Sequence, residues 1–276
     1  MLHRRFAKEE RAQLCDRALD YFSEVDRPVP SNELVRVLFP RARLENGHGP
    51  QLLREVLRRD RRFQEPRNGT WDLIGARFHH LDLADARFCV VDLEATGSNP
   101  RRDQVIEVGI VVIEGLRITR RYSSLVNPGQ RIPVWIRKLT GIDDSVVADA
   151  PSFAEVAPEI VDVLRDGIFV AHNVDFDERF LRGRLEAEGI HQPWWPTLCT
   201  VRLSRCLLTD QESYRLDALA EGLGIDLDQH HRAVCDAEAA AQILLHIVRD
   251  HAPELGIRTV GELLVSSRGS VRKQAS

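Results

Sequence analysis

Four acidic residues and one histidine are grouped in three short segments of this chain. Asp92 and Glu94 lie in Val-Val-Asp-Leu-Glu-Ala-Thr-Gly, Asp177 lies in Ala-His-Asn-Val-Asp-Phe-Asp, and His231 and Asp236 lie in His-Arg-Ala-Val-Cys-Asp. Carboxylate oxygens are hard ligands of the kind that Mg²⁺ and Mn²⁺ prefer. A single Asp-x-Glu pair is more often a solvated strand edge. If the fold brings all three segments together, however, the four carboxylates could hold two divalent cations against a phosphate group.

The first two acids come at the end of a predicted buried strand. Residues 87–91 are mostly apolar and β-branched, which is typical of such a strand. Side chains two positions apart on a strand point to the same face, so Asp92 and Glu94 should aim at one point. Thr96 and Gly97 then break the strand.

The third acid follows a second predicted strand, over residues 167–173. A helix should begin near Asp175, which is an acceptable N-cap residue. Asp177 would then lie in the first turn of that helix, where the helix dipole favours a negative charge. The nearby His172 is expected to be a structural residue rather than a ligand.

His231 and Asp236 are five residues apart, so on one continuous helix their side chains would point in different directions. We therefore expect His231 in a loop and Asp236 one turn inside a helix over the alanine-rich residues 235–248. A histidine titrates near neutral pH, with an ordinary pKa of ~6.5, and suits the removal of a proton from water. The adjacent His230 is the alternative base.

Together these residues predict phosphodiester hydrolysis by two cations, Mg²⁺ or Mn²⁺, held roughly 3.5–4 Å apart. One ion would activate a water molecule and the other would stabilise the leaving 3′-oxygen. Asp92, Glu94, Asp177 and Asp236 would be the metal ligands, and His231 would accept the proton of the water.

The chain from about residue 86 to residue 248 resembles the DEDD exonucleases of the subgroup with a catalytic histidine, and in particular the epsilon-type proofreading subunit or domain of bacterial DNA polymerase III. The three motifs carry the resemblance, and further segments support it: residues 105–109, 139–142, 152–156 and 216–219. The resemblance implies a 3′→5′ exonuclease that releases nucleoside 5′-monophosphates. It also implies a ribonuclease-H-like α/β core with a central mixed sheet.

Two positions refine this resemblance. The family usually has threonine where this chain has Ala95, which offers no hydroxyl group to a nucleotide. The tyrosine subgroup would have its tyrosine at the position of Arg232, so the histidine subgroup fits better. Thr96, Thr140 and Phe176 are the expected substrate contacts. The alternatives are a helix-to-loop turn for Thr140 and helix-to-sheet packing for Phe176.

The core should contain strands near residues 88–92, 104–114, 116–126, 167–172 and 197–200 and helices over residues 153–165, 177–188, 215–223 and 235–248. The expected organisation is a small module over residues 1–80, a linker near residues 77–86, the exonuclease domain over residues 86–250, and a partly disordered tail over residues 251–276. The tail contains one possible short helix, at residues 259–264.

The N-terminal eighty residues carry a net charge of +4, from 16 Lys and Arg against 12 Asp and Glu, whereas the remaining 196 residues carry −8. Helical patterns over residues 9–25, 32–39 and 51–59, with Ser31 as an N-cap, precede a hairpin around Asn68 and Gly69. This order predicts a winged helix-turn-helix-like module. Its third helix and wing would present arginines to a phosphate backbone, namely Arg54, Arg58, Arg59, Arg61, Arg62 and Arg67. The alternative is a basic face that binds protein or docks on the exonuclease domain.

Composition excludes several classes of protein. None of the apolar stretches approaches the ~20 residues of a membrane span, and the N-terminus does not have the pattern of a secretory signal. The five cysteines form no Cys-x-x-Cys pair, so neither a zinc site of that type nor a disulfide framework is predicted. A cytoplasmic protein is therefore expected.

Three hypotheses remain open from the sequence. The first is a DNA exonuclease of proofreading or repair that acts on single-stranded 3′ ends, with a DNA polymerase or repair protein as a possible partner. The second is an exoribonuclease of the same fold, and the third is a catalytically silent nucleic-acid-binding adaptor. Substitution of Asp177 by alanine should abolish turnover in either enzyme and change nothing in the adaptor.

Overall fold

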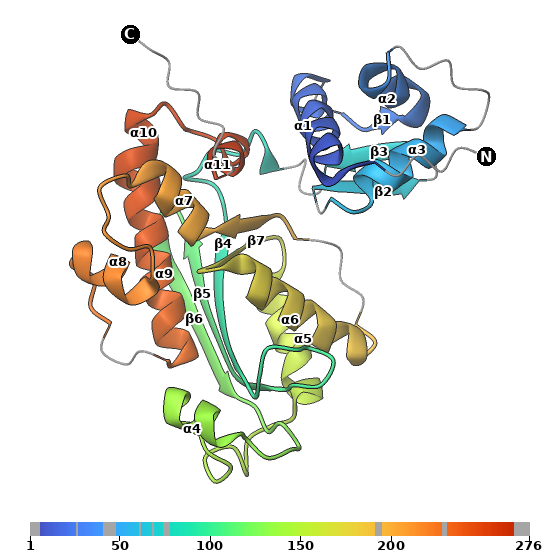
Figure 1. The fold of residues 1–276 in the computed structure, drawn as a ribbon. Helices are drawn as coiled ribbons and strands as arrows, with labels where there is room; N and C mark the ends of the chain where they lie inside the picture. Colours follow the sequence, from blue (N-terminus) through green and yellow to red (C-terminus); the bar gives the residue numbers. More distant parts are fainter. Residues whose placement is uncertain are drawn as a thin grey trace. The chain divides into compact units, whose positions relative to one another are not determined.

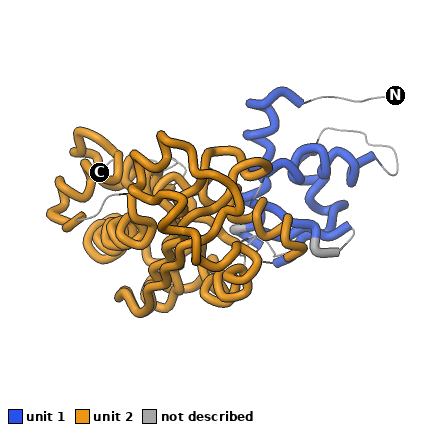
Figure 2. The backbone as a smooth tube through the Cα atoms, turned by 90° about the horizontal axis from the view of Figure 1, so that it is seen from below, with its two compact units in different colours: residues 1–77 blue, residues 78–276 orange. Residues whose placement is uncertain are grey.

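The computed structural model describes residues 6–25, 27–40, 48–60, 62–67, 69–73, 78–190, 195–227 and 231–267. The chain divides into two compact units, Met1–Arg77 and Phe78–Ser276 (Figure 2). Within the described residues, none of the helices is both long enough and apolar enough to cross a membrane.

The described part of the first unit contains three helices and a three-stranded antiparallel sheet of order β1-β3-β2 (Figure 1). Its elements are α1 (Lys8–Val25), β1 (Val29–Pro30), α2 (Ser31–Leu38), α3 (His48–Leu57), β2 (Phe63–Arg67) and β3 (Thr70–Leu73). The three predicted helices and the hairpin are confirmed. Strand β1 was not predicted, because two residues are too short for a periodic signal.

The start of α2 differs from the prediction by one residue. Pro30, not Ser31, is the N-cap, and Ser31 is the buried first residue of the helix. The main-chain N–H of Ser31 donates to the carbonyl of Gly69 at 2.8 Å. The β2–β3 turn therefore satisfies a helix-start N–H that a side-chain cap would otherwise satisfy.

The second unit contains a five-stranded mixed sheet of order β6-β5-β4-β7-β8. Its strands are β4 (Phe88–Ala95), β5 (Val105–Glu114), β6 (Arg117–Leu125), β7 (Ile168–Ala171) and β8 (Thr197–Cys199). β4, β5 and β6 pair antiparallel, while β7 runs parallel to β4 and to β8. The predicted mixed central sheet is confirmed.

Helices cover both faces of this sheet (Figure 1). Phe88 and Val90 pack in one apolar core with α9, whereas Cys89 and Val91 pack in the other with α5 and α6, as the twofold period of a strand requires. The helices are α4 (Val134–Thr140), α5 (Phe153–Leu164), α6 (Val174–Ala187), α7 (Thr200–Leu207), α8 (Leu216–Gly222), α9 (Ala233–His246), the π-helix η2 (Ile247–His251), α10 (Ala252–Glu254) and α11 (Val260–Ser266). Helices α4 and α7 were not predicted from the sequence.

Residues 78–86 pack into the second unit, although the sequence had suggested a linker there. Phe78, Leu83 and Ala86 are buried in the core that faces α9. The main-chain N–H of Leu83 donates to the carbonyl of Arg258 at 2.9 Å, and the N–H of Val260 donates to the carbonyl of Leu81 at 2.9 Å. The segment is therefore bound to the residues around α11, whose position matches the short helix expected at residues 259–264.

Helix α9 lies unusually close to strand β5, at Gly109. A Cβ atom at Gly109 would lie 2.2 Å from the carbonyl carbon of Ala233 and 2.3 Å from the nitrogen of Val234. Because both of these atoms are main chain, they cannot move aside as the end of a flexible side chain could. The absence of a side chain at residue 109 thus lets the first turn of α9 rest on the sheet beside Asp92, which is paired with Gly109.

We predict that Gly109→Ala destabilises the second unit by more than the ~1–3 kcal/mol typical of core overpacking, because the methyl group meets main chain. Gly115→Ala is the matched control. Its Cβ would meet nothing within 4 Å, so only its positive φ of 58° opposes the change, a strain of about 1–2 kcal/mol. Urea denaturation measures both, and equal losses in the two variants would contradict the close approach.

Candidate metal and active site

The candidate site is at the carboxyl end of β4. Asp92 and Glu94 share the alternation of Phe88 and Val90, so their side chains leave the sheet on the face that α9 covers. Both residues are partly exposed. The sequence prediction that the two carboxylates share one face therefore agrees with the observed strand.

The first turn of α9 brings Asp236 to the same face. The helix begins at Ala233, with Arg232 as its N-cap, so Asp236 lies one turn inside it as predicted. Asp236 is buried, and its Oδ2 accepts a hydrogen bond from the main-chain N–H of His231 at 3.0 Å. His231 lies before the helix and has a φ of 66°, in the left-handed region. The carboxylate of Asp236 thus fixes the backbone of the loop that carries the histidine.

Glu94, His231 and Asp236 form a group with the spacing of metal ligands. One ligand atom of each lies within 4.8 Å of the other two. Ligands on opposite sides of Mg²⁺ are about 4.2 Å apart, since each Mg–O bond is about 2.1 Å. Two of the three ligand atoms are carboxylate oxygens, which suit a hard divalent cation. The three atoms would need to move only slightly closer together to bind one.

Asp177 approaches the same end of β4 from helix α6. It is buried, with 3% of its surface exposed, and its Oδ1 accepts a hydrogen bond from the main-chain N–H of Leu93 at 3.2 Å. Leu93 lies between Asp92 and Glu94, so this contact ties α6 to the strand segment that carries both acids.

The start of α6 also differs from the prediction. Its N-cap is Asn173, which has a φ of 87°, and the helix begins at Val174. Asp175 is therefore not the N-cap. It lies inside the first turn and pairs with Arg202. The earlier start still leaves Asp177 in the first turn, as predicted.

The carboxylates of the cluster resist ionisation. Burial, followed by the charges of Asp236 and Glu107, raises the pKa of Asp92 to about 8. Burial and the charge of Asp92 raise the pKa of Glu94 to about 9. Burial and the same charge also raise the pKa of Asp177 well above its ordinary value. The cluster therefore lacks positive charge, which bound divalent cations would supply.

Glu107, to which the sequence analysis gave no role, holds this arrangement together. It is fully buried on β5, directly opposite Glu94. Its carboxylate accepts hydrogen bonds from the Nη2 of Arg232 at 2.8 Å and from the main-chain N–H of Ala233 at 3.0 Å. Glu107 thus binds the N-terminus of α9, where the helix dipole favours an anion. The sequence signal that could have identified Glu107 is a charged residue within the otherwise apolar part of a predicted strand.

The hydroxyl groups of the two threonines expected to bind substrate make local hydrogen bonds. The Oγ1 of Thr96 accepts from the main-chain N–H of Gln104 at 2.9 Å and from the Nε2 of Gln130 at 2.8 Å. The Oγ1 of Thr140 donates to the carbonyl of Ile136 at 3.0 Å and accepts from the N–H of Ile142 at 3.1 Å. Thr140 therefore takes part in the turn that ends α4, which was the alternative to a substrate contact.

The rings of Phe176 and His172 both contact neighbouring groups of the protein. Phe176 is partly exposed, and its ring centroid lies 5.6 Å from that of Phe180. The ring nitrogens of His172 pair with the Oγ1 of Thr200 at 2.8 Å and with the carbonyl of Tyr214 at 3.1 Å. Burial lowers the pKa of His172, which agrees with a structural residue. His230, the alternative base, lies outside the described residues.

Three arginines of the first unit that were expected to contact a phosphate backbone are engaged in ion pairs. Arg54 and Arg58 bind the carboxylate of Glu65 at 2.8 and 3.0 Å. The hydrogen bond from Arg54 lowers the pKa of Glu65 to about 2. The positive charge of this helix end is therefore partly neutralised inside the unit.

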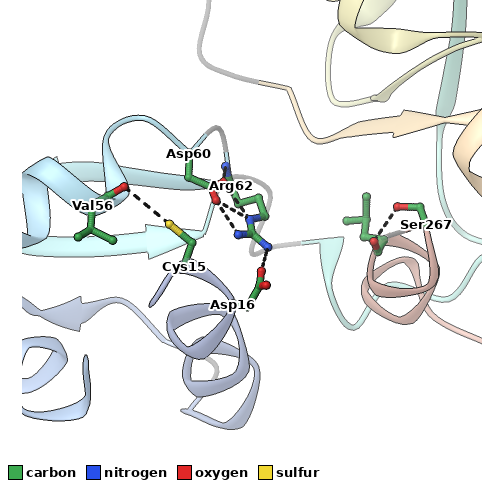
Figure 3. Close-up of polar contacts among 7 residues, drawn as sticks. Cys15, Asp16, Val56, Asp60, Arg62 and Ser267 are labelled. Carbon is green, nitrogen blue, oxygen red and sulfur yellow. Dashed lines mark hydrogen bonds and ion pairs between the residues drawn. The ribbon is translucent and has the colours of Figure 1, made fainter. Parts of the chain in front are cut away.

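Arg62 pairs with Asp60 at 2.6 Å and with Asp16 at 2.8 Å (Figure 3). Arg59 is exposed. Arg67 lies in β2, but its side chain is outside the described residues, as is all of Arg61. Of the predicted arginine set, Arg58 and Arg59 have the most exposed side chains that the structure describes.

The raised pKa values predict that divalent-cation binding is coupled to proton release. Without metal, the free energy of unfolding should fall as the pH rises from about 4 to about 9. The folded state holds the protons of Asp92 and Glu94 up to pKa values of about 8 and 9. The unfolded chain already loses them near pH 4, so rising pH favours unfolding. The increase in melting temperature on adding Mn²⁺ should therefore be larger at pH 9 than at pH 6. Asp92→Asn should reduce this pH dependence. A stabilisation by Mn²⁺ that is independent of pH would contradict the proton coupling.

Residues 89–244 match a family model described as exonuclease. Over 169 residues the chain is 36% identical to DNA polymerase III subunit epsilon of Aquifex aeolicus, covering 61% of this chain and 84% of that protein. Over 163 residues it is 41% identical to the 3′-5′ exonuclease DinG of Bacillus subtilis, covering 59% of this chain but only 18% of DinG. The chain thus spans less than a fifth of that relative.

Among solved structures, the nuclease domain of 3′hExo, a DEDDh family member bound to rAMP, has a TM-score of 0.53 at 21% identity, covering 61% of this chain and 94% of that one. This likeness supports the fold, and the matched family model covers all five candidate residues. The chain therefore belongs to the exonuclease family.

Proposed function

We propose that this chain is a metal-dependent 3′→5′ exonuclease that releases nucleoside 5′-monophosphates from single-stranded DNA in proofreading or repair. The convergence of Glu94, His231 and Asp236 within 4.8 Å is the observation that carries the proposal. The buried Asp177 and the partly exposed Asp92 supply the remaining carboxylates at the same strand end.

In this proposal Asp92, Glu94, Asp177 and Asp236 hold two divalent cations, Mg²⁺ or Mn²⁺. The ions would supply Lewis acidity and neutralise charge at the scissile phosphate. His231 accepts the proton of the attacking water, a role suited to an imidazole near neutral pH. The hydrogen bond from the His231 N–H to Asp236 keeps its loop beside the reacting phosphate.

A partly apolar surface on α4 favours a single-stranded substrate. Val134, Trp135 and Leu139 are 58%, 59% and 46% exposed, and the exposed Lys138 lies on the same face at helical spacing. Unpaired bases stack on exposed aromatic rings, and cationic side chains attract the backbone phosphates. The opposite face of α4 is buried through Ile136, so the exposed face is free of the core.

This surface belongs to the same end of the sheet as the carboxylates. Ile136 packs in one apolar cluster with Ile106, the neighbour of Glu107 on β5. The side chain of Gln130, just before α4, donates to Thr96 at the end of β4. A strand of nucleic acid that enters the cluster of acids would therefore pass near α4.

The direct test is a time course on 3′-labelled and 5′-labelled single-stranded DNA and RNA oligonucleotides, with Mg²⁺, with Mn²⁺ and with EDTA. A 5′-labelled substrate that shortens as a ladder, while a 3′-labelled substrate releases labelled mononucleotide at once, would support 3′→5′ attack. Faster loss of RNA than of DNA would favour the exoribonuclease alternative. Absence of metal-dependent cleavage of either polymer would refute the catalytic proposal.

Asp177→Asn should lower kcat by at least about a hundredfold, because metal ligation supplies several kcal/mol and each 1.36 kcal/mol is tenfold in rate. The amide oxygen can still accept the hydrogen bond of the Leu93 N–H, so the fold should remain intact. The metal-free melting temperature should not fall, since a buried charge is removed. Full activity in this variant would exclude Asp177 as a ligand.

Trp135→Ala should raise KM for single-stranded DNA by about tenfold with little change in kcat, since stacking of a base on an aromatic ring contributes about 1–3 kcal/mol. Leu255→Ala is the control, because Leu255 is 54% exposed elsewhere in the same unit. Steady-state kinetics on oligonucleotides of several lengths would measure both. An equal KM in the two variants would argue against a contact between α4 and the substrate.

For the first unit we propose a winged helix-turn-helix-like module, on the basis of its element order α1-β1-α2-α3-β2-β3. DNA contact would rest mainly on Arg58 and Arg59, whose side chains are exposed. Arg54, Arg58 and Arg62 would first have to exchange their carboxylate partners for phosphates. A DNA polymerase or a repair protein is the proposed partner of the whole chain, by analogy with its relatives.

A further inference from the structure

Two histidines at the far end of α9 face each other through the same ring atom. The Nε2 of His246 lies 3.1 Å from the Nε2 of His251, and the two rings are inclined by 68°. One oxygen of the Asp250 carboxylate lies 2.8 Å from the Nδ1 of His246, within ion-pair distance. About ten residues of α9 separate this pair from Asp236, a distance of about 15 Å along the helix.

The distance between the two nitrogens matches ligation of one metal ion. With Zn–N bonds of about 2.0–2.1 Å, two ligating nitrogens lie about 2.9 Å apart at a right angle and about 3.4 Å apart at the tetrahedral angle. The observed 3.1 Å falls between these limits. Imidazole nitrogen suits Zn²⁺, Ni²⁺ or Cu²⁺, whereas the carboxylate cluster suits Mg²⁺ or Mn²⁺.

Asp250 prepares one of the two rings for such a role. Because the negative carboxylate lies beside Nδ1, it favours the neutral tautomer of His246 with its proton on Nδ1. The lone pair of Nε2 then faces His251. A carboxylate behind a ligating histidine fixes the tautomer of the ring and increases its basicity. The side chain of His246 is 35% exposed, so an ion could enter from solvent.

The backbone brings the pair together through a rare feature. On an α-helix, residues five apart point about 140° away from each other. Here Ile247–His251 form a π-helix, and the N–H of Ala252 donates to the carbonyl of Ile247, five residues earlier. This wider turn returns His251 to the side of His246. π-helical turns are frequent at functional sites. Arg249, which donates to the carbonyl of Leu116, holds the turn against the sheet.

We propose that His246 and His251 form a second metal site, for a transition-metal ion such as Zn²⁺, with Asp250 as the positioning residue. Among the described residues, Glu94, His231 and Asp236 are the one group of three side chains with the spacing of metal ligands. The histidine pair therefore supplies two protein ligands, and water completes the coordination. The bound ion links the end of α9 to the start of α10.

The test is Zn²⁺ titration calorimetry on the full chain carrying Glu94→Gln and Asp236→Asn, which disable the carboxylate cluster. This background should bind one Zn²⁺, and adding His246→Gln or His251→Gln should weaken binding at least about tenfold. Asp250→Asn should also weaken it by about tenfold or more. His48→Gln, in the first unit, is the control and should leave the affinity unchanged.

Imidazole ¹⁵N NMR on the chain with both histidines intact keeps the proposal testable if a variant fails to fold. Addition of Zn²⁺ should shift the Nε2 resonances of His246 and His251 together and leave the Nδ1 of His246 protonated. Equal Zn²⁺ affinity in all variants, or unmoved Nε2 resonances, would overturn the proposal and leave a hydrogen-bonded histidine pair only. In that case Pro253, which cannot continue an α-helical hydrogen-bond ladder, would be the cause of the wider turn.

Discussion

Repulsion among carboxylates is the constraint on which the larger unit of this protein depends. Asp92, Glu94 and Asp177 have raised pKa values because the surrounding protein desolvates their carboxyl groups and because other carboxylates lie close to each of them. Such a cluster opposes folding unless it stays protonated or binds cations. Main-chain groups hold two of the acids in place: the N–H of Leu93 binds Asp177, and the N–H of His231 binds Asp236. Because the fold holds these like charges close together, the binding of divalent cations to them should be strongly favourable.

The position of α9 follows from two contacts with β5. Glu107 accepts the N–H of Ala233 at the start of the helix, and Gly109 leaves room for the main chain of the same residue. The hydrogen bond of Glu107 and the space left by Gly109 are thus two residues apart on β5. Together they set how far along the sheet α9 begins, and so where Asp236 meets Asp92.

Much of this organisation could be predicted from the sequence, because the signals were local. The alternation of β4 and the alanine-rich helix predicted where Asp92, Glu94 and Asp236 would point. The role of Glu107 could not be predicted, because it depends on Arg232, which is 125 residues away in the chain. The ion pairs that engage Arg62 were missed for the same reason, since Asp16 lies 46 residues earlier. The burial of Asp177 depends on packing between α6 and β4, which periodicity does not report.

The segments that flank residues 86–250 have a practical consequence for anyone who wishes to isolate the nuclease unit. Phe78 and Leu83 before β4, and Val260 and Leu263 after α10, are buried in one core, and Asp82 bridges to Thr259. A fragment trimmed to residues 86–250 would expose this apolar surface to water and lose the bridging strand contact. Fragments intended for crystallisation or screening should therefore begin before Phe78 and extend through Ser266.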